Sequence, residues 1–163
     1  MIIIHYGLLV ALAIALLFAA YTDVRSRKIA NWLNIAIAAG APAFWWASGL
    51  SLWPDMAWQL GFAIVVSGLL IGVAWIGYKI GVVILGGGDI KLLGALALWL
   101  TPLNYVDMLW HMALCGGAIA IFFLLRLMIM KPKTRGVLPY GVAIAFGTLW
   151  VLYPQLAAVP NLA

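Results

Sequence analysis

Residues 82–100, VVILGGGDIKLLGALALWL, place a carboxylate and three consecutive glycines inside a long apolar stretch. An acid at membrane depth costs about 2.5–3.5 kcal/mol on insertion scales, so Asp89 is a candidate functional residue by default. Gly86, Gly87 and Gly88 can break a helix and allow another backbone to approach closely. Non-helical backbone at membrane depth is tolerated only where it is buried in protein or lines a wet cavity. The stretch therefore predicts a broken membrane helix beside a functional acid.

The whole chain has the composition of a membrane protein. Of its 163 residues, 67% are hydrophobic and only 8% are charged, and the mean hydropathy is +1.17. An ordinary soluble domain carries about 25% charged residues, so this composition excludes a soluble domain and a disordered chain. A nucleic-acid partner is also excluded, because nine Lys and Arg residues spread along the chain form no basic face. One Cys and two His are too few for an internal disulfide or a Cys or His metal cluster, so we expect no metal and no cofactor.

The apolar residues form six stretches of membrane-spanning length. A helix needs about 20 residues to cross a bilayer. We therefore predict an all-α, polytopic membrane protein with six transmembrane helices in a single domain, residues 1–163. The stretches cover about residues 2–21, 32–50, 56–78, 81–102, 108–130 and 137–153, and the fourth is irregular. In the sixth, small residues fit close helix packing, namely Gly141, Ala143, Ala145 and Gly147.

The basic residues predict the orientation of these six stretches. With this register, all nine fall on one side, which the positive-inside rule makes cytosolic. The opposite loops carry Asp55 and Asp107 and no Lys or Arg, so both termini are expected outside. The nine are Arg25, Arg27, Lys28, Lys79, Lys91, Arg126, Lys131, Lys133 and Arg135.

Carboxylate chemistry can come only from four aspartates, because the chain has no Glu. Asp55 and Asp107 are expected to be solvated turn residues. Asp23 and Asp89 both fall at the cytosolic edge of a span. If these two meet in a low-dielectric site they share a proton, so one can act as a base on water while the other donates to a carbonyl. Two alternatives stay open here: Asp23 as a solvated loop residue beside three cations, and Asp89 as a helix N-cap.

Three sequence blocks resemble the motifs of type IV prepilin peptidases, which are GxGD intramembrane aspartic proteases. GGGDIKL, residues 86–92, resembles the GxGD-x-K-L motif, and DVRSRKIAN, residues 23–31, resembles the first motif. LPYGVAIAFG, residues 138–147, resembles the third block, and the three occur in family order. Ala30 stands where the family usually has Pro, which loosens the turn. The chain also lacks the methyltransferase insertion with its cysteine pairs, so it resembles the short Tad/Flp-pilus type.

The resemblance implies an aspartic endopeptidase that removes the leader from a prepilin, either a Flp-type pilin or a pseudopilin. Cleavage would follow a Gly at the cytosolic boundary of the bacterial inner membrane, and the partners would be this substrate and membrane lipid. Asp23 and Asp89 would be the catalytic pair. The implied supporting or substrate-binding residues are Gly86, Gly88, Lys91, Asn31, Pro139 and Tyr140.

Two other functions compete with this interpretation. A small proton-coupled transporter or substrate-binding membrane subunit would use Asp89 as the ion site, but it should place that acid near mid-bilayer between inverted repeats. No such repeat is visible, and the acids fall at one face. A purely structural assembly protein would leave both Asp23 and the glycine-flanked Asp89 unexplained. The protease hypothesis further predicts that residues 86–88 are irregular. It also predicts that Asp23 and Asp89 lie near each other, without requiring contact before a substrate arrives.

Overall fold

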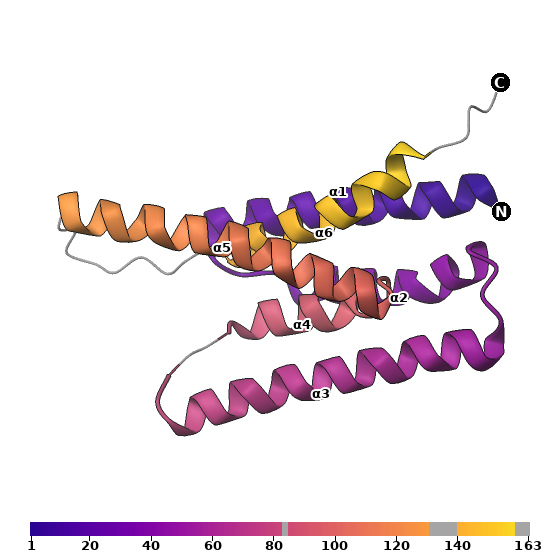
Figure 1. Cartoon of the computed structure of the whole chain (residues 1–163), viewed down its shortest axis with the longest axis horizontal. Coiled ribbons are helices and arrows are strands. Elements are labelled where there is room, and N and C mark those ends of the chain that lie inside the picture. The colour runs from indigo at the N-terminus through magenta and orange to yellow at the C-terminus, as the bar shows by residue number, and fades with distance from the viewer. Residues whose placement is uncertain (83–84, 131–139, 159–163) are drawn as a thin grey trace.

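The computed structural model describes residues 1–82, 85–130 and 140–158, and within these ranges the chain is helical with no strand. The predicted all-α class is therefore confirmed. Figure 1 shows the helices running roughly along one common direction. In chain order they are α1 (Ile2–Ser26), α2 (Asn31–Ala47), the π-helical turn η1 (Leu52–Met56), α3 (Ala57–Lys79), α4 (Gly87–Leu96), α5 (Pro102–Met130) and α6 (Tyr140–Ala157).

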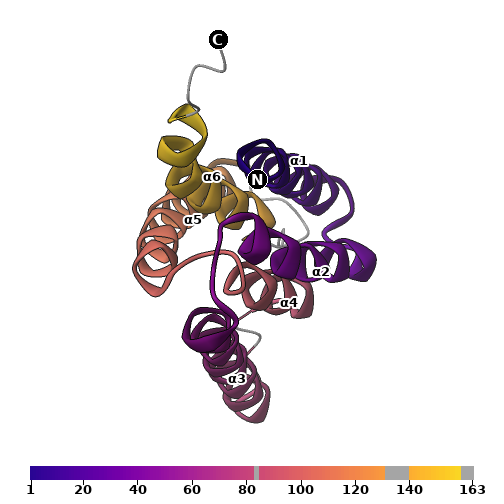
Figure 2. The ribbon, with the colours of Figure 1, turned by 90° about the vertical axis from the view of Figure 1, so that its right-hand side faces the viewer.

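The short helix α4 lies at the centre of the packing. It contacts α2, α3 and α6, while α6 also packs along α1 and α5. Figure 2 shows α4 between α2 and α3, with α3 at the margin of the bundle. Leu92, Leu93 and Leu96 of α4 are almost completely buried. Their contacts with the rest of the apolar core hold this helix in place, although its length is only 10 residues.

Within the described residues, four helical segments are long and apolar enough to cross a membrane: Ile2–Ser26, Leu52–Lys79, Pro102–Arg126 and Tyr140–Ala157. The outer surface of α3 is strongly apolar, with Leu69 and Ile71 65% and 60% exposed. Such a surface is typical of a helix face that contacts lipid or another protein. The predicted second and fourth stretches correspond to the shorter helices α2 and α4. A 10-residue helix rises only about 15 Å, roughly half of a hydrocarbon core, so α4 by itself is too short to span.

The C-terminal end of α4 is closed by side chains from its neighbours. Gln59 of α3 donates from Nε2 to the carbonyls of Ala97 and Leu100, at 2.8 and 2.7 Å. The indole of Trp45 in α2 donates to the Leu98 carbonyl at 2.7 Å. The carbonyls that follow a helix end have no partner within the helix, and these three bonds satisfy them without water.

A tight turn joins α1 to α2 and brings the first motif against α4. Arg27 adopts a left-handed conformation (φ 53°, ψ 35°) and its N–H returns to the Asp23 carbonyl at 2.8 Å, which ends α1. Ala30 is extended (φ −66°, ψ 133°) and precedes the first residue of α2. The boundary predicted for this helix, at about residue 32, therefore agrees with the structure to within one residue.

The backbone of Ala30 leads to a stability prediction. Its φ of −66° matches the angle that a proline ring imposes, so Ala30→Pro should fold normally and gain about 0.4–1 kcal/mol by restricting the unfolded chain. Ile35→Pro, inside α2, is the control and should lose about 3 kcal/mol or more. Thermal unfolding in detergent measures both. A collapse of Ala30→Pro to the level of the control would contradict this account of the turn.

Candidate active site

Asp23 lies in the last turns of α1 and is 7% exposed. Its Oδ2 accepts the backbone N–H of Gly141, in the first turn of α6, at 2.8 Å. The first N–H groups of a helix have no partner within the helix, and the helix dipole favours a negative charge there. The alternative that Asp23 is a solvated loop residue is therefore wrong, because the carboxylate is buried and bound to a helix N-terminus.

Asp89 is the third residue of α4 and is 9% exposed. Its carboxylate accepts a backbone hydrogen bond from Gly86, the residue that caps α4. A side chain at this position reaching back to the cap residue is half of a capping box. The alternative that Asp89 is the N-cap is therefore wrong, because Gly86 is the N-cap residue of α4. The acid nevertheless closes the start of the helix.

The break predicted around the three glycines is present but is displaced toward the N-terminus. Val82, Leu85 and Gly86 are non-helical, whereas Gly87 and Gly88 form the first turn of α4. The prediction that all of residues 86–88 are irregular is therefore wrong. The physical reason is the hydrogen bond from the Ile90 N–H to the Gly86 carbonyl at 3.1 Å, which starts the helix immediately after Gly86.

Both aspartates line one pocket of about 330 Å³. Its other walls come from the α1–α2 turn and from the start of α4. The prediction that the two acids lie near each other is confirmed, while their catalytic role stays a prediction. The lining residues are Asp23, Arg27, Lys28, Ile29, Asn31, Gly86, Gly87, Gly88 and Asp89.

Three of the predicted supporting residues take part in the contact between α2 and α4. Lys91 donates from Nζ to Oδ1 of Asn31 at 2.9 Å. At Gly88 a Cβ would come within 3.3 Å of the Ile29 Cβ, so the absence of a side chain allows the α1–α2 turn to pack on α4. Tyr140 begins α6 but does not line the pocket, and Pro139 falls outside the described residues.

Two residues of the site escaped the sequence analysis. Gly141 was interpreted only as a packing residue, yet its N–H holds Asp23, and a Cβ there would lie 2.9 Å from the Asp23 Cβ. Asn34, 4% exposed, donates from Nδ2 to the Gly88 carbonyl at 3.3 Å. A buried amide one turn after Asn31, on the same face of an apolar helix, was the available signal. By contrast, Gly147 packs against the backbone of α5 around Met112, as the small-residue pattern predicted.

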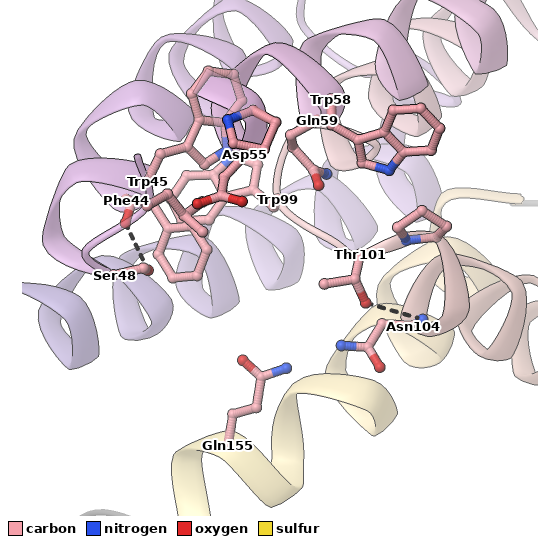
Figure 3. Close-up of a pocket in the computed structure, with 13 residues that line it drawn as sticks. Phe44, Trp45, Ser48, Asp55, Trp58, Gln59, Trp99, Thr101, Asn104 and Gln155 are labelled. Carbon is pink, nitrogen blue, oxygen red and sulfur yellow. Dashed lines mark hydrogen bonds between the residues drawn. The ribbon is translucent and has the colours of Figure 1, made fainter. Parts of the chain in front are cut away.

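A second, larger pocket of about 650 Å³ lies at the opposite end of the bundle. Figure 3 shows its aromatic wall of Phe44, Trp45 and Trp99, with Asp55 as the single acid among the lining residues. Asp55 is exposed and accepts from the N–H and the hydroxyl of Ser51, at 3.0 and 2.8 Å. This agrees with its interpretation as a turn residue, and the aromatic pocket has no second carboxylate for a dyad.

The remaining acid, Asp107, also stands apart from the dyad. It is exposed, as predicted, but the prediction that it is a turn residue is wrong, because α5 already begins at Pro102. Its Oδ1 lies 3.3 Å from the Nδ1 of His111 on the same helix. Within the described part of the chain, no three His, Cys, Asp or Glu side chains are grouped so that they could hold a metal ion. The pocket between Asp23 and Asp89 is therefore the candidate active site.

The contact between Gly141 and Asp23 leads to a second stability prediction. In Gly141→Ala the new Cβ would overlap the Asp23 side chain, so α1 and α6 must separate, at a cost of about 1–3 kcal/mol. Gly117→Ala in α5 is the matched control, because no atom lies within 4 Å of its Cβ position, and helix propensity should make it neutral or stabilising. Thermal unfolding in detergent compares the two, and equal stabilities would refute the close approach.

Comparison with known proteins relates this chain to one protein family. No curated protein matches the chain, and no solved structure does. The type IV leader peptidase family matches residues 10–158, a range that contains Asp23, Asp89, the three glycines and Gly141. With nearly its whole length matched, the chain belongs to the type IV leader peptidase family.

Proposed function

We propose that this protein is an intramembrane aspartic endopeptidase that removes the leader from prepilins, with Asp23 and Asp89 activating water. The observation that supports it most directly is the pocket that both acids line. Two buried carboxylates from distant parts of the chain face one cavity, and each accepts a hydrogen bond from a backbone N–H. Burying two acids so close together lowers the stability of the fold, and groups buried at such a cost are typical of functional sites.

The arrangement is suited to general acid–base hydrolysis of a peptide bond. One carboxylate, ionised, takes a proton from water as the water attacks the scissile carbonyl carbon. The other, protonated, donates to the carbonyl oxygen, so a tetrahedral diol forms between them. When the C–N bond breaks, the carboxyl that took the water proton passes it to the leaving amine, and the other carboxylate takes back a proton from a diol hydroxyl. The backbone N–H groups of Gly141 and Gly86 keep the two acids oriented through these steps.

We further propose that the chain crosses the inner membrane of a bacterium in six passes, with the dyad on the cytosolic side and both termini outside. Figure 1 shows the C-terminal ends of α1, α3 and α5 at the same end of the bundle as the N-terminal end of α4. These ends carry the described basic residues, whose one-sidedness supports a cytosolic position. Lys131, Lys133 and Arg135 lie outside the described residues. The position of both acids at one end also argues against a transporter with a mid-bilayer ion site.

Conservative replacement of each acid tests the mechanism. Asp23→Asn and Asp89→Asn are nearly isosteric, so each variant should insert and fold yet lose at least about 1,000-fold in cleavage rate. The double variant should be no slower than the singles, because the two carboxylates act as one unit. A purified prepilin reconstituted in vesicles provides the assay. Asp55→Asn and Asp107→Asn are the controls and should keep full activity. Robust turnover by either dyad variant would overturn the mechanism.

A pair of neighbouring glycines tests the positioning of Asp89. A Cβ on Gly86 would lie 2.8 Å from Oδ2 of Asp89, whereas one on Gly87 meets no atom within 4 Å. Gly86→Ala should therefore displace the carboxylate and slow cleavage by about 100-fold, the effect of a misplacement of roughly 1 Å. Gly87→Ala should cleave at the rate of the unmodified protein. Equal rates for the two variants would show that the Gly86–Asp89 contact is irrelevant to catalysis.

A further inference from the structure

A groove of about 570 Å³ runs beside the candidate active site, between α2 and α3 and along α4. Its lining residues repeat at helical spacing on each of the three helices, so the groove follows their direction. On α4 the lining extends from Ile90 to Ala95, which corresponds to about 7.5 Å of helix rise, and Leu98 continues it just past the end of the helix. The groove is lined by Asn31, Asn34, Ile35, Ala38, Ser67, Ile71, Ile90, Lys91, Gly94, Ala95 and Leu98.

The groove adjoins the dyad pocket at one end. Asn31 lines both cavities. At this junction Lys91 is bonded to Asn31, and Asn34 is bonded to the carbonyl of Gly88, a residue of the pocket wall. The amide oxygen of Asn34 is buried and has no hydrogen-bond partner in the described chain. The junction therefore contains a buried acceptor that a peptide N–H could satisfy after a small rotation of the amide.

The remainder of the groove has the character of a helix-binding surface. Away from the junction it is lined mainly by apolar side chains, and the small Ala38 on α2 leaves room for a helix to approach. Gly94 is already in close contact with α3, because a Cβ there would lie 2.8 Å from the Ser67 Oγ. Both α2 and α3 pack on α4, and the groove opens between them. Ile71, at this opening, is 60% exposed.

We propose that this groove seats the apolar helix of the substrate, which reaches it laterally from the lipid between α2 and α3. The proposal rests on the proposed function. In such a substrate the scissile bond lies in the dyad pocket and an apolar helix follows it immediately. The substrate therefore needs polar contacts next to the pocket and an apolar surface beyond them. The groove has its polar residues at the junction with the pocket and its apolar lining beyond that junction. Recognition would follow the helix-in-groove mode, with small residues contacting the backbone of the helix.

Site-directed disulfide cross-linking tests the position of the substrate helix. The background carries Asp89→Asn to prevent turnover and Cys115→Ser to remove the single cysteine. Ile71→Cys faces the groove, and Leu69→Cys, similarly exposed but absent from the groove lining, is the matched control on α3. The probe is a polypeptide with a basic leader ending in Gly, followed by a 20-residue apolar helix with one Cys near its second turn. We expect at least about fivefold more disulfide at Ile71→Cys, because the two Cα atoms must lie within about 7 Å.

A kinetic pair tests the same groove in the active protein. Ala38→Phe fills the groove and should raise KM for the probe at least about tenfold, whereas Ala39→Phe, on the exposed adjacent position outside the groove, should leave KM unchanged. If the unmodified protein cleaves the probe but cross-linking is equal at both cysteines, as expected if only lipid occupies the groove, the proposal that the groove seats the substrate helix is wrong. The proposed function would then still stand. Failure of the unmodified protein to cleave the probe would overturn the proposed function and the groove with it.

Discussion

The hydrogen bond from the Gly141 N–H to the Asp23 carboxylate is the contact on which the geometry of the site depends. A carboxylate buried among apolar helices is tolerated only with strong donors around it. Here the donor comes from the start of α6, at a position where the backbone N–H is not used by the helix itself. The bond therefore fixes the end of α1 to the beginning of α6. Glycine is required at this point because a Cβ would occupy the same space as the aspartate.

The same solution is used for the second acid. Asp89 accepts from Gly86 at the start of α4, so two helix N-termini, those of α4 and α6, supply backbone donors to one pocket. Each glycine here serves a close approach: Gly86 to Asp89, Gly88 to Ile29 and Gly141 to Asp23. Helix starts and glycines thus supply backbone donors to two buried acids, in a pocket whose lining also includes Arg27 and Lys28.

Sequence reasoning predicted the helical class and the break before α4 from hydropathy and the three glycines. It predicted the proximity of Asp23 to Asp89 from their common membrane face together with the resemblance to the peptidase family. It could not predict which backbone groups bind the carboxylates. The partner of Asp23 lies on the last helix of the chain, and only tertiary packing brings Gly141 there. Asn34 was missed for a similar reason, because its bond to Gly88 depends on how α2 crosses α4. The lengths of α2 and α4 were also overestimated, because hydropathy counts apolar residues whether or not they lie within the helix.

The two ends of α4 are held very differently, and this has a mechanical consequence. At its C-terminal end, Gln59 and Trp45 bind three carbonyls that follow the helix, those of Ala97, Leu98 and Leu100. At its N-terminal end the helix begins with glycines and makes its contacts through the Asp89 carboxylate and the Gly88 backbone. The carbonyls at the end of α4 remote from the dyad are thus held by side chains of two other helices, whereas Asp89 is held from within its own helix start. A small tilt of α4 about its C-terminal end would therefore change the spacing of the two carboxylates.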